Sequence, residues 1–454
     1  MRNYSANHGS GSSIHDTIER GGCLLQQLVH PIRNGSVRQW VESTGIIGLY
    51  IFAFGMLYKK SVAHAGILLM AVAYGFSVKD MGKEVLRDRL LLLSIGFFVF
   101  LTLRTIFAAF EFPDYKPLLI EGAFKLFGTG FFLAYLVAFW LYRAKDKWDG
   151  ILIVFMAGFL CQILRQLDWA NLIGEMRHIL VDGERPTFGF STNRFGLFSA
   201  LIFLSCVLLY SQVWGRSRTK AWHFLRIGFW SLMCPMSLLG VYFSQSRSAW
   251  IAAALVIPMA IFWNYFRNKK RNWKPLVVMA GLVMIAFFMA NGPNLIARRF
   301  DLSGMDSRIR LYHLAWEKWK EHPLFGNGPG TSRILVQQGG DELALEKSTG
   351  ADHLHNVILD VAAQIGMTGI IFFAVSFYLI THEAIAAKSA EPSDRPYILF
   401  ALSGMAMILL TGLPNQPLSS PHGVYLIGFL GGICYSFKFS HPPSIETIPS
   451  HACR

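Results

Sequence analysis

Long apolar runs alternate with short polar segments along most of the chain. A helix of about 20 apolar residues crosses a bilayer, because each residue adds about 1.5 Å. Twelve segments approach this length, and each predicts a transmembrane helix. They cover residues 41–57, 62–78, 90–110, 118–141, 151–164, 195–214, 224–243, 250–266, 276–290, 357–380, 397–413 and 424–439. The segments 151–164 and 276–290 are short for a full span.

The composition fits a chain that is solvated largely by lipid. Of the 454 residues, 53% are hydrophobic and only 15% are charged, whereas soluble domains carry about 25% charged residues. These charges are too few to cover the surface of a soluble protein of this length. The six cysteines form no CxxC pair, which argues against a zinc or disulfide framework. We therefore expect an all-α integral membrane protein with about twelve transmembrane helices.

The net charge of +14 carries an orientation signal. Lys and Arg accumulate in the short cytoplasmic loops of membrane proteins. If the amino terminus lies inside, 18 Lys and Arg residues fall in inward loops and 4 in short outward loops. The outward ones are Lys59, Lys60, Lys116 and Arg247. This distribution predicts that both termini are cytoplasmic.

Two predicted outward connections, residues 165–194 and 291–354, are much longer than a turn between helices requires. Such loops are usually functional or disordered. The second is rich in aromatic residues, and Ser307 to Glu321 has the pattern of an amphipathic helix. Its aromatic side is formed by Ile309, Tyr312, Trp316 and Trp319. We therefore expect the function on the external face.

These patterns divide the chain into five parts. They are a cytoplasmic extension (1–39), transmembrane helices 1–9 (40–290), a large helical periplasmic loop between helices 9 and 10 (291–354), transmembrane helices 10–12 (355–440) and a cytoplasmic tail (441–454).

The predicted external segments contain more Arg than Lys. Arg presents a planar fork of donors that matches phosphate oxygens in pairs. These Arg residues could also be solvated or paired with nearby Asp and Glu. They are Arg165, Arg177, Arg185, Arg194, Arg247, Arg298, Arg299, Arg308, Arg310 and Arg333.

Two of these arginines have distinctive surroundings. Arg247 lies in a polar turn, Ser244 to Trp250, between two apolar spans. An ionisable residue near membrane depth is costly and usually functional, although snorkelling to the interface lowers the cost. Arg194 follows Asn193, which we expect to start a helix. The Asn193–Arg194 pair therefore predicts either a helix cap with a snorkelling arginine or an anion site at a helix amino end.

The segment from Asp352 to Asn356 contains His353 and His355. On a helix, residues two apart point in nearly opposite directions, so these histidines would not share a metal ion. We expect no metal site. A neutral imidazole near the aqueous boundary can remove a proton from a sugar hydroxyl. A helix-capping or solvated histidine is the alternative for each.

Together these motifs resemble the O-antigen ligase and polymerase family. The resemblance rests on their order, spacing and common predicted side of the membrane. The motifs are Ser246-Arg247-Ser248; Asp306-Ser307-Arg308 with Trp316; His322-Pro323-Leu324-Phe325-Gly326-Asn327-Gly328-Pro329-Gly330; and His355-Asn356 followed by Leu359, Gly366 and Gly369.

The resemblance implies a fold of the membrane glycosyltransferase type, in the bacterial inner membrane, with a periplasmic active site. It implies His355 as the catalytic residue and Arg247 and Arg308 as binding residues for the diphosphate. Arg194, Arg310, Asn356 and His353 are further candidates for binding the substrate. No cofactor, nucleotide sugar or obligatory metal is expected.

Ligases of this family transfer polysaccharide from undecaprenyl diphosphate to the lipid A core, whereas polymerases extend the lipid-linked chain. The expected partners are undecaprenyl diphosphate-linked polysaccharide, lipid A core and membrane lipid, but not nucleic acid. The external arginines favour the phosphorylated core as acceptor, and hence a ligase. A polymerase remains the alternative. A transporter is a third hypothesis, since twelve spans are common in transporters, but no inverted repeat is visible.

Overall fold

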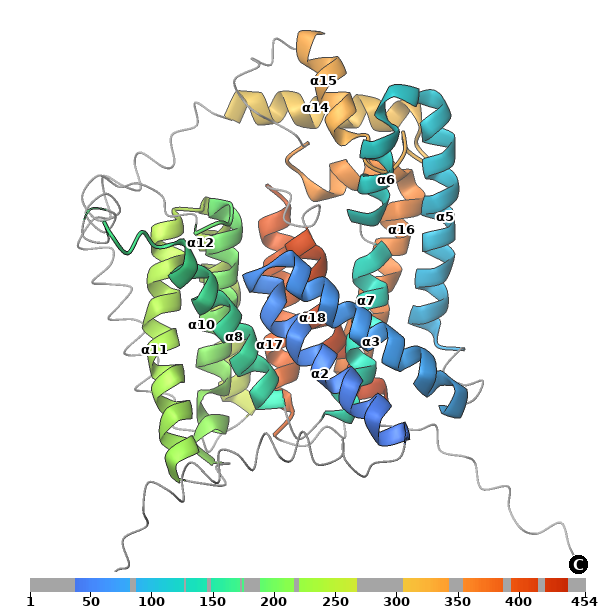
Figure 1. The fold of residues 1–454 in the computed structure, drawn as a ribbon. Helices are drawn as coiled ribbons and strands as arrows, with labels where there is room; N and C mark the ends of the chain where they lie inside the picture. Colours follow the sequence, from blue (N-terminus) through green and yellow to red (C-terminus); the bar gives the residue numbers. More distant parts are fainter. Residues whose placement is uncertain are drawn as a thin grey trace, which may run out of the picture.

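The protein is represented by a computed structural model that describes residues 37–81, 87–125, 128–144, 148–171, 174, 188–215, 220–267, 305–342, 354–386, 393–414 and 421–439. Within these ranges every regular element is a helix (Figure 1). The elements are α2 (Val37–Tyr58), α3 (Lys60–Met81), α5 (Arg89–Glu111), η1 (Pro113–Tyr115), α6 (Lys116–Lys125), α7 (Gly128–Arg143), α8 (Trp148–Gln166), α10 (Thr192–Gly215), α11 (Lys220–Ser244), α12 (Arg247–Arg267), α14 (Met305–Glu321), α15 (Ser332–Glu342), α16 (Val357–Ala386), α17 (Arg395–Gly412) and α18 (Pro421–Phe439).

Nine helices in the described part of the chain are long and apolar enough to cross a membrane: α2, α3, α5, α8, α10, α11, α12, α16 and α17. This confirms the predicted class of an all-helical, multi-pass membrane protein. The short segment 151–164 belongs to the 19-residue helix α8. The predicted span 276–290 lies outside the described residues, so the total of twelve and the five-part division stay predictions.

The structure corrects the predicted single span over residues 118–141. The chain forms two helices there, α6 and α7. The ten residues of α6 include Lys116, Glu121 and Lys125, so this helix is too polar and too short to cross a bilayer. It packs beside α5 and contributes Leu119 to a small cluster with Ala108 of α5 and Ile334 of α15.

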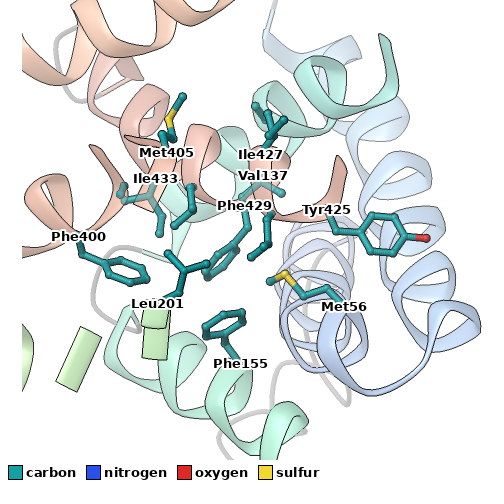
Figure 2. Close-up of a cluster of buried hydrophobic side chains, with 14 of the residues drawn as sticks. Met56, Val137, Phe155, Leu201, Phe400, Met405, Tyr425, Ile427, Phe429 and Ile433 are labelled. Carbon is teal, nitrogen blue, oxygen red and sulfur yellow. The ribbon is translucent and has the colours of Figure 1, made fainter. Parts of the chain in front are cut away.

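The last helix, α18, lies at the centre of the bundle and is buried along nearly its whole length. It packs against α2, α7, α16 and α17. Figure 2 shows the core around it, where Phe429 of α18 stacks on Phe155 of α8 with ring centroids 5.3 Å apart. Other helices therefore surround α18 along nearly its whole length.

Polar networks join helix ends at one end of the bundle, which we call the lower end. Asp88 caps α5 by accepting hydrogen bonds from the backbone N–H groups of Leu90 (2.9 Å) and Leu91 (3.1 Å). Its carboxylate also accepts from Lys438 Nζ at 2.7 Å, near the end of α18. We call the opposite end, where α3, α10, α12, α16 and α18 begin, the upper end. Helix α14 lies across it at the top of Figure 1.

Candidate functional site

The predicted turn that carries Arg247 is confirmed. Helix α11 ends at Ser244, Gln245 adopts the left-handed conformation with φ 48°, and α12 begins at Arg247. The Ser246 hydroxyl oxygen lies 3.3 Å from the backbone nitrogen of Ala249, which donates to it as in a helix cap. The turn therefore places Arg247 in the first turn of α12, at the upper end.

Arg194 lies on the neighbouring helix. Helix α10 begins at Thr192, and the Arg194 Nε donates to the Ser191 hydroxyl at 2.8 Å. The expectation that Asn193 starts this helix is wrong. Its side chain instead accepts a hydrogen bond from the Ser246 hydroxyl at 2.8 Å. This bond joins the first turns of α10 and α12, so the structure brings the segments of Arg194 and Arg247 together.

His355 lies directly before α16, as the sequence predicted. It has φ 51°, in the left-handed region that is uncommon for residues other than glycine. The Asn356 side-chain oxygen accepts from the backbone N–H groups of Ile358 (3.0 Å) and Leu359 (3.1 Å). Asn356 is thus the amino-terminal cap of α16 and sets where the helix begins beside His355.

A tyrosine on α14 connects the predicted Arg308 with His355. The Tyr312 hydroxyl donates to the His355 carbonyl oxygen at 3.3 Å. Arg308 lies one turn earlier on α14, and its charge acts on the Tyr312 phenol. Burial raises the pKa of Tyr312, and the Arg308 charge lowers it by a smaller amount, so the phenol remains a donor at neutral pH. The structure therefore brings Arg308 and His355 together.

We did not predict Tyr312 as a site residue. The available signal was its spacing of four from Arg308 on a predicted helix, which places both on one face. Arg310, by contrast, lies on an exposed part of α14. His353 lies outside the described residues. The predicted helix over 307–321 is confirmed as α14, but its buried side consists of Leu311, Leu314 and Ala315, whereas Trp316 is 46% exposed.

Helix α16 is interrupted about three turns after His355. Gly366 has φ 66° and ψ −162°, which is not a helical conformation. The Met367 N–H donates to the Pro323 carbonyl at 2.9 Å instead of to a helical carbonyl. The Thr368 N–H likewise donates to the Leu324 carbonyl at 3.2 Å. Both donors released by the break are therefore satisfied by the segment 322–331, which we call the glycine loop.

The acceptors released by the break also bind the glycine loop. The Ala363 carbonyl accepts from the Asn327 N–H at 2.9 Å, and the Gln364 carbonyl accepts from the Gly328 N–H at 2.8 Å. A broken helix within a membrane protein must find such internal partners, because lipid offers none. The sequence motif of the glycine loop thus has a structural role, which is to complete the interrupted helix that begins beside His355.

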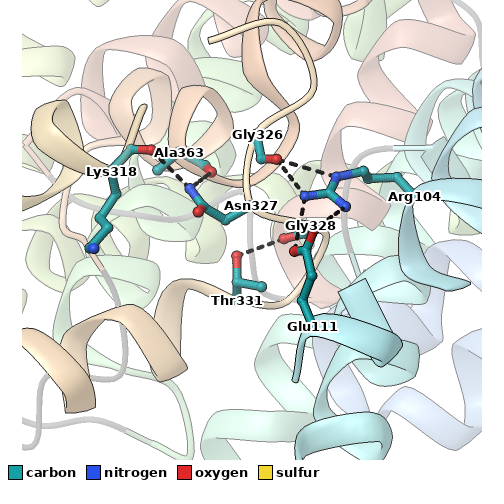
Figure 3. A network of polar contacts seen from close by, with 8 residues as sticks. All are labelled: Arg104, Glu111, Lys318, Gly326, Asn327, Gly328, Thr331 and Ala363. Atoms are coloured by element: carbon teal, nitrogen blue, oxygen red, sulfur yellow. Dashed lines mark hydrogen bonds and ion pairs between the residues drawn. The ribbon is translucent and has the colours of Figure 1, made fainter. Parts of the chain in front are cut away.

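Side chains hold the same junction. Figure 3 shows Asn327 Nδ2 donating to the carbonyls of Lys318 (2.9 Å) and Ala363 (3.0 Å). Below it, buried Asp360 accepts hydrogen bonds from Ser332 Oγ and from Gln364 Nε2. The junction therefore ties α14, α15 and α16 to one another.

An intramembrane arginine that we did not predict also binds the glycine loop. Arg104 lies inside the apolar segment 90–110 and donates to the Gly326 carbonyl from Nε (3.2 Å) and Nη2 (2.7 Å). It also pairs with Glu111 at 3.3 Å (Figure 3). The sequence feature that could have identified Arg104 is its position as a charged residue within an apolar run. A charged residue in such a run is functional by default.

The described part of the chain contains three non-glycine residues with positive φ: Phe188, Gln245 and His355. Such conformations cost about 1–3 kcal/mol each and cluster at functional sites. Phe188 lies in the predicted segment before Arg194, Gln245 lies two residues before Arg247, and His355 is the predicted catalytic residue. Backbone strain thus coincides with the three segments selected from the sequence.

One comparison with known proteins matches a segment that carries part of this site. No curated protein matches the chain. A family model described as O-antigen ligase matches residues 232–374. The matched segment contains Arg247, Arg308, the glycine loop, His355 and Gly366. We conclude that residues 232–374 are similar to the O-antigen ligase family, which confirms the resemblance that the sequence motifs predicted.

Proposed function

We propose that the protein is an O-antigen ligase that transfers polysaccharide from undecaprenyl diphosphate to a sugar hydroxyl of the lipid A core. The family of residues 232–374 comprises membrane enzymes that act on lipid-linked glycans. The observation that carries the specific proposal is the contact between Tyr312 and the His355 carbonyl. It joins the helix of Arg308 to the histidine best suited to act as a base.

In the proposed reaction, His355 accepts the proton of the acceptor hydroxyl. The hydroxyl oxygen then bonds to the anomeric carbon of the donor sugar, while the bond from that carbon to the diphosphate oxygen breaks. The electron pair leaves with undecaprenyl diphosphate. Attack from the face opposite the diphosphate inverts the anomeric configuration. General base catalysis of this kind contributes about 10²–10⁴-fold to a rate.

Arginines would stabilise the leaving diphosphate through charge-assisted hydrogen bonds, which strengthen as negative charge develops. Arg308 stands beside Tyr312, and Arg194 and Arg247 occupy the first turns of α10 and α12. Helix α14 and the starts of α10 and α12 lie at the upper end of the bundle (Figure 1). Arg310 and His353 stay predictions for acceptor or donor binding.

We further propose that the upper end faces the periplasm of the bacterial inner membrane and that both termini are cytoplasmic. Lys60 and Arg247, which we predicted to lie outside, occur at the upper end, and basic residues such as Arg226 and Lys438 occur near helix ends at the lower end. Cytoplasmic loops of membrane proteins carry this excess of Lys and Arg. The twelve-span topology is part of the same proposal.

The decisive test uses the purified protein in nanodiscs with undecaprenyl diphosphate-linked polysaccharide, with and without lipid A core. We expect polysaccharide attached to the core, and only when the core is present. Lengthened lipid-linked glycan formed without the core would identify a polymerase instead. If no glycan were transferred but substrate were taken up into vesicles, the protein would be a transporter and not a glycosyltransferase.

A further inference from the structure

Outside the matched family segment, a buried histidine lies at the upper end where three helices begin. We infer that His422, Lys60 and Arg194 form a binding site for the oxygens of a phosphate or diphosphate group, between the first turns of α18, α3 and α10. The inference rests on the proposed function in one respect only, which is the assignment of this diphosphate to the lipid-linked donor.

The His422 ring is buried and held in one orientation. The residue is 8% exposed, and its Nδ1 lies 2.7 Å from the Met56 carbonyl oxygen at the end of α2. Since a carbonyl only accepts, Nδ1 must carry a proton. The rings of Phe190 and Phe198 lie against the imidazole, with centroids 5.7 Å and 6.0 Å away. The other ring nitrogen, Nε2, has no hydrogen-bond partner among the described residues.

Two cations act on this ring. Arg194 lies one turn before Phe198 on α10, and Lys60 is the first residue of α3, four residues after Met56. Burial lowers the pKa of His422 to about 4, and the positive charges of Arg194 and Lys60 act in the same direction. Within the described ranges, the hydrogen bond of the Arg194 guanidinium goes from Nε to Ser191, which leaves its two Nη groups for another acceptor. Neither cation forms an ion pair with a described carboxylate.

The hydrogen bonds between helices fix the positions of these groups. The Tyr425 hydroxyl lies 2.6 Å from His64 Nε2, one helical turn after Lys60. This contact and the bond from His422 to Met56 hold the start of α3 against the start of α18. Ser246 and Asn193 join α12 to α10 beside them. The amino ends of several helices therefore converge, and each carries a partial positive charge.

The ligand chemistry follows from this combination. The positive charges of Lys60 and Arg194 have no carboxylate partner among the described residues, and such a pair of cations favours a bound anion. A guanidinium fork binds two oxygens of a phosphate group, an ammonium adds a mobile point charge, and helix amino ends attract phosphates. Without a ligand the His422 ring is neutral at neutral pH, because its pKa is lowered to about 4. A bound anion beside Nε2 would raise this pKa, and the protonated Nε2–H would then donate to a phosphate oxygen. A diphosphate has enough oxygens to meet all three side chains.

The test measures binding without any glycan or acceptor. The full chain in phosphatidylcholine nanodiscs is titrated with inorganic pyrophosphate and, separately, with farnesyl diphosphate. The variants are Lys60→Gln, which changes an exposed side chain, and His422→Asn, whose amide can still donate to the Met56 carbonyl. The matched control is Lys59→Gln, because Lys59 is an exposed neighbour at the same corner.

We expect each of the two site variants to weaken pyrophosphate binding by about tenfold, the effect of losing one charge-assisted hydrogen bond, and the control to leave it unchanged. Tighter binding of farnesyl diphosphate than of pyrophosphate would support a prenyl-linked ligand. Competition by phosphatidylglycerol in the nanodisc would support a phospholipid headgroup at the same site. Equal affinities of wild type and Lys60→Gln, or no binding to wild type, would overturn the inference.

The outcome is separable from that of the proposed function. If Lys60→Gln loses pyrophosphate binding while the wild type transfers no glycan, the anion site stands and the ligase assignment falls. If the wild type transfers glycan and Lys60→Gln binds pyrophosphate normally, the ligase assignment stands and the anion site falls.

Discussion

The Tyr312 hydroxyl donates a hydrogen bond to the backbone carbonyl of His355, with 3.3 Å between the two oxygens. The two residues are 43 positions apart, on α14 and directly before α16. Tyr312 thus bonds to the backbone of His355 and not to its imidazole ring, and the bond holds the backbone that carries the ring. Tyr312 is therefore a positioning residue for the proposed base, and its removal should affect His355 without altering its chemistry.

Replacing Tyr312 by Phe removes this bond and keeps the ring. We expect a loss of stability of about 0.5–1.5 kcal/mol, as for a typical hydrogen bond. The turnover number should fall by roughly tenfold with little change in KM, because a misplaced base affects the chemical step. Thermal unfolding and steady-state transfer assays measure the two effects. Tyr378→Phe, at an exposed position of α16, is the control and should behave like wild type.

High pH should act through the same phenol. Burial raises the pKa of Tyr312, whereas the unfolded chain ionises near the ordinary value of 10.0. The folded state therefore binds the phenolic proton more tightly than the unfolded chain does. The resulting contribution of Tyr312 to stability is complete below pH 10.0 and is lost as the pH rises through the folded pKa. The stability difference between wild type and Tyr312→Phe should be constant below about pH 9 and shrink at higher pH. A difference that shrinks on acidification would contradict this assignment.

Substitution of His355 tests the proposed base directly. We expect His355→Asn to lower the rate of glycan transfer by about 10²–10⁴-fold. Asparagine adopts the left-handed conformation readily, so the backbone at φ 51° and its bond from Tyr312 should survive. His313→Ala, at an exposed position on α14, should retain activity. Transfer by His355→Asn at the wild-type rate would remove His355 from the role of base.

Alanine at Gly326 or Gly366 should disrupt the junction between the glycine loop and α16. A Cβ on Gly326 would lie 2.3 Å from the Gln364 carbonyl carbon, and one on Gly366 would lie 2.4 Å from that of Leu324. Both residues also have positive φ. Strain and overpacking together predict that either substitution lowers the free energy of unfolding by about 2–5 kcal/mol. Scanning calorimetry or fluorimetry measures it. Gly96→Ala is the matched control, since nothing lies within 4 Å of its added carbon.

Arg104 should stabilise the glycine loop more than its neighbour Glu111 does. Replacement of Arg104 by Met removes both hydrogen bonds to the Gly326 carbonyl. We expect the free energy of unfolding to fall by about 1.5–3 kcal/mol. Lysine should restore only part of it, because its ammonium cannot form the same two-nitrogen contact. Glu111→Gln should cost less than about 1 kcal/mol, since this carboxylate is partly exposed. If Arg104→Lys were as stable as wild type, the charge alone would account for the contribution of Arg104.

The sequence predicted the local elements of the site well. The polar turn before Arg247, the helix over 307–321 and the start of α16 beside His355 were each predicted and are confirmed. These features depend on neighbouring residues, namely an apolar run, a polar break and a capping side chain. Local patterns of this kind are visible in one dimension.

Other features could not be found in the same way. The segment 118–141 reads as one span because its apolar average conceals the charges of α6, a short helix that packs beside α5. Asn193 appeared to be a cap because the sequence does not show that Ser246, on another helix, would bond to it. The role of Arg104 depends on a carbonyl 222 residues away.

By itself the sequence determined the class of the protein, its helices and the segments in which chemistry was expected, because hydrophobic periodicity and motif spacing act over a few turns of chain. Only the tertiary structure decided which of these residues meet. It paired Tyr312 with His355, joined Asn193 to Ser246 and placed Lys60 and Arg194 where their charges act on His422. Contacts between distant segments arise from how the helices pack, and that packing is determined by side chains distributed over the whole chain.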